Sequence, residues 1–222
     1  MRERLVFYIE KFFIYIGGAV CHREAARSLI SVSGAEVPFC ARCEGLYLGF
    51  FIAFLFLAVK KRLGGDKPPG LLFFCAAAAG VTVFIADGAS SYLGFRETNN
   101  LIRLITGLLC GAPLPALYVL VFNYRPETGG SAPVIKNIFE FLFVLSISFA
   151  VGLCAYAGLE GFWFIVSLSA CAGEALVLYY VSKIIIKTVS RKPREKIIRA
   201  LSCFAAALII ILSNAFQAAM IS

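Results

Sequence analysis

Charged residues are scarce in this sequence. Of its 222 residues, 15% are Asp, Glu, Lys or Arg, whereas 60% are hydrophobic and 21 are Phe. A soluble domain of this length does not carry so much apolar surface. The shortage of charge therefore excludes an ordinary soluble domain and indicates a membrane protein.

Histidine is scarcer still, since His22 is the only one. The HExxH motif of metalloproteases needs two histidines, and the sequence contains neither a Walker loop nor a Ser-His-Asp order. Standard hydrolase and ATPase mechanisms therefore have no support. Nucleic-acid binding is also disfavoured, because the basic residues form short loop clusters without interleaved aromatic residues.

Long apolar runs are plentiful. A membrane-spanning helix needs about 17–25 residues, and six runs come close to this length, at 44–59, 70–87, 101–122, 138–158, 161–182 and 199–221. A seventh run, 5–20, contains Glu10 and Lys11, so it is either a short span or an interfacial helix, and we favour a span. The sequence predicts an all-α polytopic transmembrane helix bundle of six or seven spans, in a single membrane domain over 1–222.

The distribution of Lys and Arg predicts the orientation, because cytoplasmic loops retain basic residues. Most basic residues fall on one side of these spans, above all in the loops 60–69 and 183–199. We therefore expect a multi-pass protein of the cell membrane, with these loops in the cytoplasm and segment 21–43 outside. The outer side carries fewer basic residues, namely Arg23, Arg27, Arg42, Arg96 and Arg103.

Segment 21–43 combines cysteine with the single histidine. Cys40 and Cys43 form a CxxC motif, and Cys21 and His22 precede it. Thiolate and imidazole groups suit zinc, and a CxxC can place two sulfurs on one ion. The four residues are therefore candidate ligands of Zn2+. Because adjacent residues rarely both reach one ion, the site is either a closed Cys3His site or one that keeps an open position.

Two other uses of these cysteines stay open. The outward compartment permits a disulfide, although three cysteines in one segment leave one thiol over, which favours a metal. Thiol exchange at the CxxC is the other alternative, because an adjacent arginine favours the thiolate. The remaining cysteines fall in apolar spans and are interpreted as packing residues, namely Cys75, Cys110, Cys154, Cys171 and Cys203.

Several polar residues lie in or beside the predicted spans. Asp87 ends one span, and Asn99, Arg103 and Thr106 follow at helical spacing, so that these three share one face. An ionised side chain inside a span usually faces a cavity or a partner. Arg103 is therefore either part of a polar pocket or an interfacial anchor paired with Asp87.

Glu174 lies well inside the run 161–182 and is too short to reach the membrane surface. It needs a proton or a partner, so it either carries protons in transport or makes a buried structural hydrogen bond. Glu174 and Asp87 are the candidate catalytic residues.

Arginine is concentrated around the cysteine segment. A planar guanidinium matches the geometry of phosphate or carboxylate. We therefore expect an outer pocket that binds an anionic lipid headgroup or a phosphorylated amphiphile, with Zn2+ polarising it. The residues expected to bind the anion are Arg23, Arg27, Arg42, Arg103, Asn99 and Thr106.

Two other functions remain as alternatives. In the first, the protein is a transporter in which the Cys/His segment is a structural clip and Glu174 and Arg103 line the pathway. In the second, it is a membrane thiol oxidoreductase that uses the CxxC.

Glycine and proline predict details of the helix packing. Gly45 and Gly49 form a GxxxG pair, Gly107 and Gly111 form a second, and such pairs allow close approach of another helix. Pro113 and Pro115 fall inside the run 101–122, so we expect that helix to kink or break.

Three stretches carry a resemblance to a known family. CHREAARS, PFCARCEGLYLGF and DGASSYLGFRETNNLIRLITGLLCG resemble the signature blocks of the multi-pass prokaryotic membrane family called domain of unknown function 2085. The resemblance runs from about Cys21 to Gly111 and implies a membrane location but no particular activity. This chain has Ala26, Glu44 and Ser91 where the family pattern has Pro, Thr and Gln.

Overall fold

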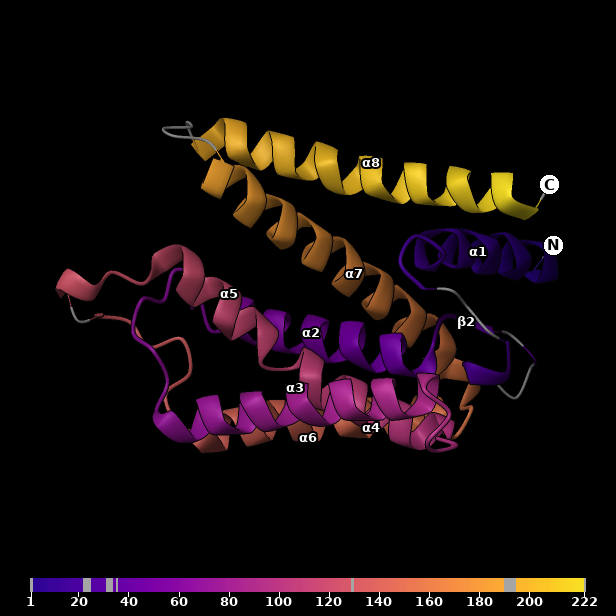
Figure 1. The fold of residues 1–222 in the computed structure, drawn as a ribbon, viewed down its shortest axis with the longest axis horizontal. Coiled ribbons are helices and arrows are strands. Elements are labelled where there is room, and N and C mark those ends of the chain that lie inside the picture. The colour runs from indigo at the N-terminus through magenta and orange to yellow at the C-terminus, as the bar shows by residue number, and fades with distance from the viewer. Residues whose placement is uncertain are drawn as a thin grey trace.

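The computed structural model describes the chain apart from residues 1, 22–24, 31–33, 35, 129, 190–194 and 222. Two predicted site residues, His22 and Arg23, lie outside the described residues. The helices, drawn in Figure 1, are α1 (Arg2–Gly17), α2 (Ala41–Val59), α3 (Leu71–Tyr92), α4 (Asn100–Gly111), α5 (Leu114–Asn123), α6 (Ile138–Tyr156), α7 (Glu160–Val189) and α8 (Glu195–Ile221).

Six segments are long and apolar enough to cross a membrane. They are α2, α3, the α4–α5 pair, α6, most of α7 and most of α8. The prediction of an all-α polytopic bundle is therefore confirmed. The predicted break is also confirmed, because α4 ends at Gly111 and α5 begins at Leu114, with Pro113 between them and Pro115 in the first turn of α5.

Helix α1 is not among the six described segments that are long and apolar enough to cross a membrane, so the seventh span favoured from the sequence is not supported. The helix has 16 residues, and its N-terminus lies at the same end of the molecule as the C-terminus and strand β2 (Figure 1). Gly17 at its far end packs against Pro38, and the Ser213 hydroxyl of α8 donates a hydrogen bond to Ala19 O at 2.6 Å. The chain therefore runs along α1 away from the end that carries β2, and the segment after α1 returns to that end. Its short apolar run, interrupted by Glu10 and Lys11, is the physical reason.

A short β-hairpin connects α1 to α2, and the sequence analysis did not predict it. Strand β1 (Ser28–Ile30) pairs antiparallel with strand β2 (Glu36–Cys40), with Ser28 opposite Cys40. The described hairpin side chains Leu29, Val37 and Phe39 are buried. Because β2 runs directly into α2, Cys40 becomes the N-cap residue of that helix.

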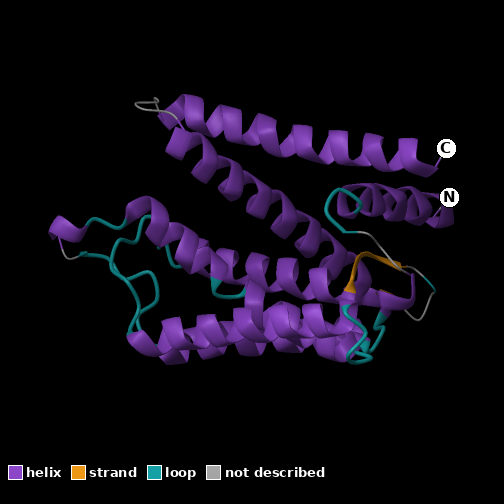
Figure 2. Ribbon diagram, in the orientation of Figure 1, coloured by secondary structure: helices purple, strands orange, loops and turns teal. Residues whose placement is uncertain are grey.

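Loops gather at two ends of the bundle (Figure 2). The hairpin, the α3–α4 loop and the α6–α7 loop lie at one end, which we call the Cys end. The α2–α3 and α5–α6 loops lie at the opposite end, together with the adjoining ends of α7 and α8. The alternation agrees with the predicted grouping, in which 60–69 and 183–199 lie on one side and 21–43 on the other.

Two GxxxG pairs lie against each other where α2 packs on α4. A Cβ atom at Gly107 or Gly111 would collide with the backbone of α2, and one at Gly45 would collide with the backbone of α4. A Cβ atom at Gly49 would lie 3.0 Å from Leu108 O. The predicted close packing is therefore confirmed, and each pair is the partner of the other. This contact brings the first turn of α2 beside α4.

A larger side chain at the glycine contact is expected to separate α2 from α4. Gly107→Leu should lower the free energy of unfolding by about 1–3 kcal/mol or more, the usual cost of overpacking. Thermal melting of the purified protein in detergent measures the loss. Gly64→Ala is the matched control, because nothing lies within 4 Å of a Cβ atom built at Gly64. Equal melting temperatures for Gly107→Leu and the parent would contradict the contact.

Candidate functional site

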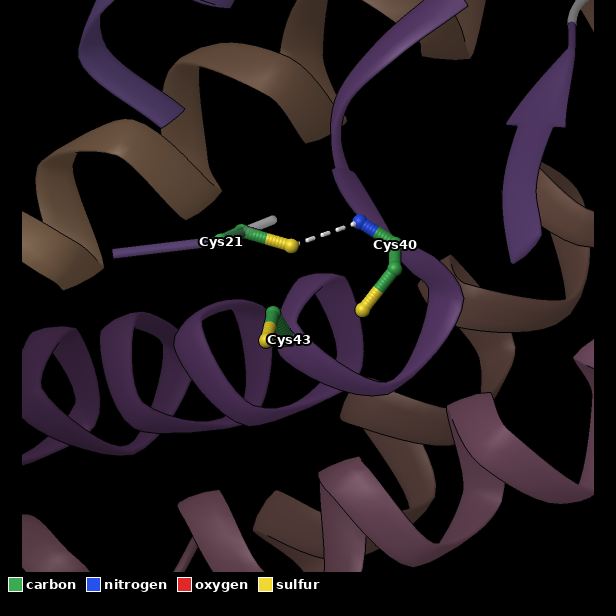
Figure 3. Close-up of side chains that lie close together, drawn as sticks. All are labelled: Cys21, Cys40 and Cys43. Atoms are coloured by element: carbon green, nitrogen blue, oxygen red, sulfur yellow. Dashed lines mark hydrogen bonds between the residues drawn. The ribbon is translucent and has the colours of Figure 1, made fainter. Parts of the chain in front are cut away.

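Three cysteines from separate elements converge at the Cys end. Cys21 follows the turn after α1, Cys40 ends β2, and Cys43 lies in the first turn of α2. Their three sulfur atoms lie within 4.8 Å of one another. Figure 3 shows Cys21 and Cys40 above the turn of α2 that carries Cys43. We call these three residues the Cys cluster.

Backbone hydrogen bonds position the Cys cluster. Cys21 N donates to Gly17 O at 3.2 Å, which holds Cys21 at the end of the α1 turn. Cys40 N donates to Cys21 Sγ at 3.3 Å. A backbone N–H directed at sulfur stabilises a thiolate. The turn after α1, the end of β2 and the first turn of α2 therefore hold three thiols close enough together to bind one metal ion.

The thiols of the cluster are chemically unequal. All eight cysteines of the chain are free thiols in the structure. Hydrogen bonds from Cys21 and Cys43 lower the pKa of Cys40 to about 2, whereas the hydrogen bond with Cys40 raises the pKa of Cys21. The neighbouring thiols therefore favour the thiolate form of Cys40, at the junction of β2 and α2.

A second group of polar residues surrounds Asp87, whose side chain is 3% exposed. Arg42 donates to Asp87 Oδ2 from Nη2 at 2.6 Å and from Nε at 3.0 Å. Arg96 Nη2 donates to Oδ1 at 2.6 Å, and the Thr98 hydroxyl donates to the same oxygen at 2.9 Å. The Thr106 hydroxyl lies 3.4 Å from Oδ2. Asp87 thus joins α2, α3, the α3–α4 loop and α4.

The predicted polar stripe of α4 divides into different roles. Asn99 caps the helix, because its side chain accepts a hydrogen bond from Ile102 N at 2.8 Å. Arg103 does not donate a hydrogen bond to Asp87, as it would in the interfacial-anchor alternative. Its Nη1 donates instead to Asn100 Oδ1 at 3.1 Å, because Arg42 and Arg96 already occupy the carboxylate of Asp87.

Arg103 is buried without full hydrogen bonding. It is 8% exposed, and its Nε is a buried donor with no partner among the described residues. Arg27 and Arg42 lie close enough for their positive charges to act on Arg103, as do the charges of Asp87 and Cys40. We call Arg27, Arg42, Arg96 and Arg103 the arginine cluster.

The hairpin brings the two clusters together. The guanidinium carbon of Arg27 lies 5.5 Å from the centre of the Tyr92 ring, and that of Arg42 lies 6.0 Å from it. Asn100 Nδ2 donates to Ser28 O at 3.3 Å, which ties β1 to the start of α4. The predicted anion-binding residues Arg27, Arg42 and Arg103 thus lie in one region beside the Cys cluster.

The two predicted catalytic residues belong to different groups. The carboxylate of Asp87 is fully engaged by donors, which suits a structural ion pair better than proton transfer. Glu174 is 0% exposed, and neither carboxyl oxygen has a hydrogen-bond partner among the described residues. Glu174 therefore lies apart from the arginine cluster, in a separate environment on α7.

Sequence reasoning missed several residues of these groups. Arg96 and Thr98 bind Asp87 from a loop, where helical periodicity gives no signal. Glu44 is 0% exposed and has no partner for either oxygen in the described part of the chain. Ser167 is likewise buried with an unpartnered hydroxyl. Its spacing of seven residues from Glu174 was a helical signal in the sequence.

Removing the charge of Asp87 is expected to destabilise the fold more than removing an exposed partner. Asp87→Asn leaves the buried Arg42 unpaired and should cost about 3–5 kcal/mol of unfolding free energy. Arg96→Ala is the control, because the Arg96 side chain is 49% exposed, and it should cost about 0–1 kcal/mol. Thermal melting in detergent compares the two variants. A smaller loss for Asp87→Asn than for Arg96→Ala would contradict this assignment.

Comparisons with known proteins cover the part of the chain that carries both clusters. The model of a family described as predicted membrane protein (DUF2085) matches residues 21–117, a range that includes the hairpin and α2 to α5.

Two archaeal relatives are similar to this chain, and both are uncharacterized. One, from Methanothermobacter thermautotrophicus, is 38% identical over 100 residues, which cover 44% of this chain and 83% of the relative. The other, from Methanocaldococcus jannaschii, is 30% identical over 107 residues, which cover 48% of this chain and 62% of the relative. No solved structure matches. The chain belongs to the DUF2085 family of predicted membrane proteins.

Proposed function

We propose that this membrane protein binds the anionic headgroup of a membrane amphiphile at the arginine cluster. The observation that carries the proposal is Arg103, a nearly buried guanidinium with an Nε donor that no described residue satisfies. A buried donor without an acceptor costs about 1–3 kcal/mol, and more when it is charged. An anionic oxygen bound beside Arg103 would remove this cost.

The local charge supports an anion. The described residues place the guanidinium groups of Arg42, Arg96 and Arg103 around the one carboxylate of Asp87. Arg103 also lies in the first turns of α4, where the helix dipole favours a negative ligand. Arg42 and Arg96 already engage Asp87, so an anion bound beside Arg103 would offset the charge of a buried guanidinium and stabilise the folded protein.

The position of the cluster favours a lipid-derived anion. Arg42, Asp87 and Arg103 belong to segments long enough to cross the membrane, and they lie near the ends of those segments. A phosphate group at the membrane surface would reach this depth with its acyl chains still in the bilayer. The excess of Lys and Arg in the loops 60–69 and 183–199 supports a Cys end that faces outward.

We also propose that the Cys cluster binds a divalent metal, with Zn2+ as the favoured ion. In tetrahedral zinc sites with Zn–S bonds of ~2.3 Å the sulfurs lie about 3.8 Å apart. Sulfur atoms within 4.8 Å of one another need only a small contraction to reach that geometry. The neighbour of Cys21 in the sequence, His22, is a candidate fourth ligand. The metal would fix the hairpin that carries Arg27.

Zinc content tests the metal proposal. Elemental analysis of purified protein should find about one zinc per chain, falling sharply in Cys40→Ser because one thiolate ligand is lost. Cys203→Ser is the control, since Cys203 is an exposed cysteine of α8, and it should keep the metal. Metal-free protein with a Cys40–Cys43 disulfide would refute the proposal and support a thiol oxidoreductase.

Binding of short-chain phosphatidic acid, measured by native mass spectrometry in neutral detergent, tests the anion proposal. Arg103→Lys keeps the charge but removes Nε and the planar fork, so binding should weaken about tenfold or more, as expected for a lost charge-assisted hydrogen bond. Arg199→Lys is the control, because Arg199 is an exposed arginine near the start of α8. Competition by inorganic phosphate would indicate a site for the phosphate group itself. Equal binding by Arg103→Lys and the parent would refute the proposal.

A further inference from the structure

A second set of unsatisfied polar groups lies between α2 and α7. The described chain has six buried side-chain polar atoms without a hydrogen-bond partner. One is Arg103 Nε, and the other five belong to Glu44, Ser167 and Glu174. All three of these residues are 0% exposed. We call this set the α2–α7 seam.

The seam follows one face of α7. Ser167, Cys171 and Glu174 are spaced i, i+4 and i+7, so their side chains share one side of the helix. The Cys171 thiol is buried and makes a long contact of 3.9 Å with Phe13 O. The stripe begins at Ser167, about two turns after the start of α7 at the Cys end, and reaches Glu174 about two turns further along the helix.

Helix α2 forms the other wall of the seam. A Cβ atom at Gly173 would collide with Tyr47 O, so the backbones of α7 and α2 touch beside Glu174. Glu174 lies close enough to Tyr47 and Cys171 for its charge to act on both. Glu44 acts on Cys171 as well. The two carboxyl groups therefore border the same buried region from opposite helices.

Packing does not explain five buried oxygens in one seam, of which, among the described residues, only those of Glu44 have a backbone N–H, that of Phe39, close enough to act on them. A buried polar group without a hydrogen bond costs about 1–3 kcal/mol, and the lipid around a spanning helix offers no water to replace the lost bond. All five atoms are oxygens, which accept hydrogen bonds and coordinate hard cations. Carboxyl and hydroxyl groups arranged in this way fit a small positive ligand and not an anion.

We propose that the α2–α7 seam binds a small monovalent cation, either a proton or Na+, with Glu174 as its principal ligand. Ser167 lies on the same face, nearer the Cys end, and offers an intermediate oxygen on the way to Glu174. The site does not depend on the proposed anion or metal sites, because it shares no residue with either. Among the described residues, the charge of Glu174 acts on Tyr47 of α2 and Cys171 of α7, and Glu44 of α2 acts on the same Cys171.

Labelling with dicyclohexylcarbodiimide tests this assignment. The reagent adds to a protonated carboxyl group in an apolar environment and leaves a stable acylurea that mass spectrometry locates. The full-length protein in detergent should be labelled at Glu174 at acidic pH. Labelling should decrease as the pH rises, because the carboxyl group loses the proton that the reaction needs.

The effect of NaCl on the labelling distinguishes a bound Na+ from a bound proton. If Na+ is the ligand, NaCl should protect Glu174 from labelling at fixed pH, whereas choline chloride at equal ionic strength should not. If the proton is the ligand, both salts should leave the labelling unchanged. Ser167→Ala should weaken the protection or shift the pH dependence, whereas Glu97→Gln, a change at an exposed carboxyl group, should have no effect.

Two results would overturn the proposal. One is the absence of label from Glu174 at every pH in protein that melts like the parent. The other is labelling that changes with neither pH nor Na+, which would mean a permanently protonated carboxyl group in a structural role. Glu174→Gln must abolish the label at this position, and its melting temperature shows whether the fold survives.

Discussion

Inside a bilayer a polar group has no water to bond with, so the protein or a bound ligand must satisfy it. Asp87 meets this condition with donors from α2, the α3–α4 loop and α4. Because these donors come from separate segments, one carboxylate fixes the Cys ends of three spans relative to one another. Among the described residues, the buried groups that do not meet this condition form two sets, Arg103 in one and Glu44, Ser167 and Glu174 in the other, and we propose a ligand for each set.

The first turn of α2 connects all of these groups. Arg42, Cys43 and Glu44 are consecutive, and successive side chains of an α-helix point about 100° apart. Arg42 reaches Asp87, Cys43 joins the Cys cluster, and Glu44 borders the α2–α7 seam. Close packing by glycine makes this possible, since α4 approaches one side of α2 at Gly107 and α7 approaches another at Gly173. One helical turn thus contributes a residue to each of the proposed anion, metal and cation sites.

Much of the fold could be predicted from hydropathy, because a spanning helix must be long and apolar whatever it packs against. The Cys cluster was also predictable as a group, since Cys40 and Cys43 are close in sequence. The partner of Asp87 was not. Arg103 shares a helical stripe with polar neighbours, which made it the candidate partner. The hydrogen bond to the Asp87 carboxylate comes instead from Arg42, 45 residues earlier in the chain, because glycine contacts bring α2 close to α4. The β-hairpin and the direction of the chain after α1 likewise depend on tertiary contacts, which the periodicity of apolar residues in the sequence does not indicate.

The central claim is that Arg103 completes its hydrogen bonding with a bound anion. A cryo-electron microscopy map of the protein in nanodiscs that contain phosphatidic acid measures this directly. The account predicts phosphate density within hydrogen-bond distance of Arg103 Nε, with Arg42 still bound to Asp87. A map in which Arg103 Nε donates to a protein carbonyl or carboxylate, with no phosphate density beside it, would contradict the account.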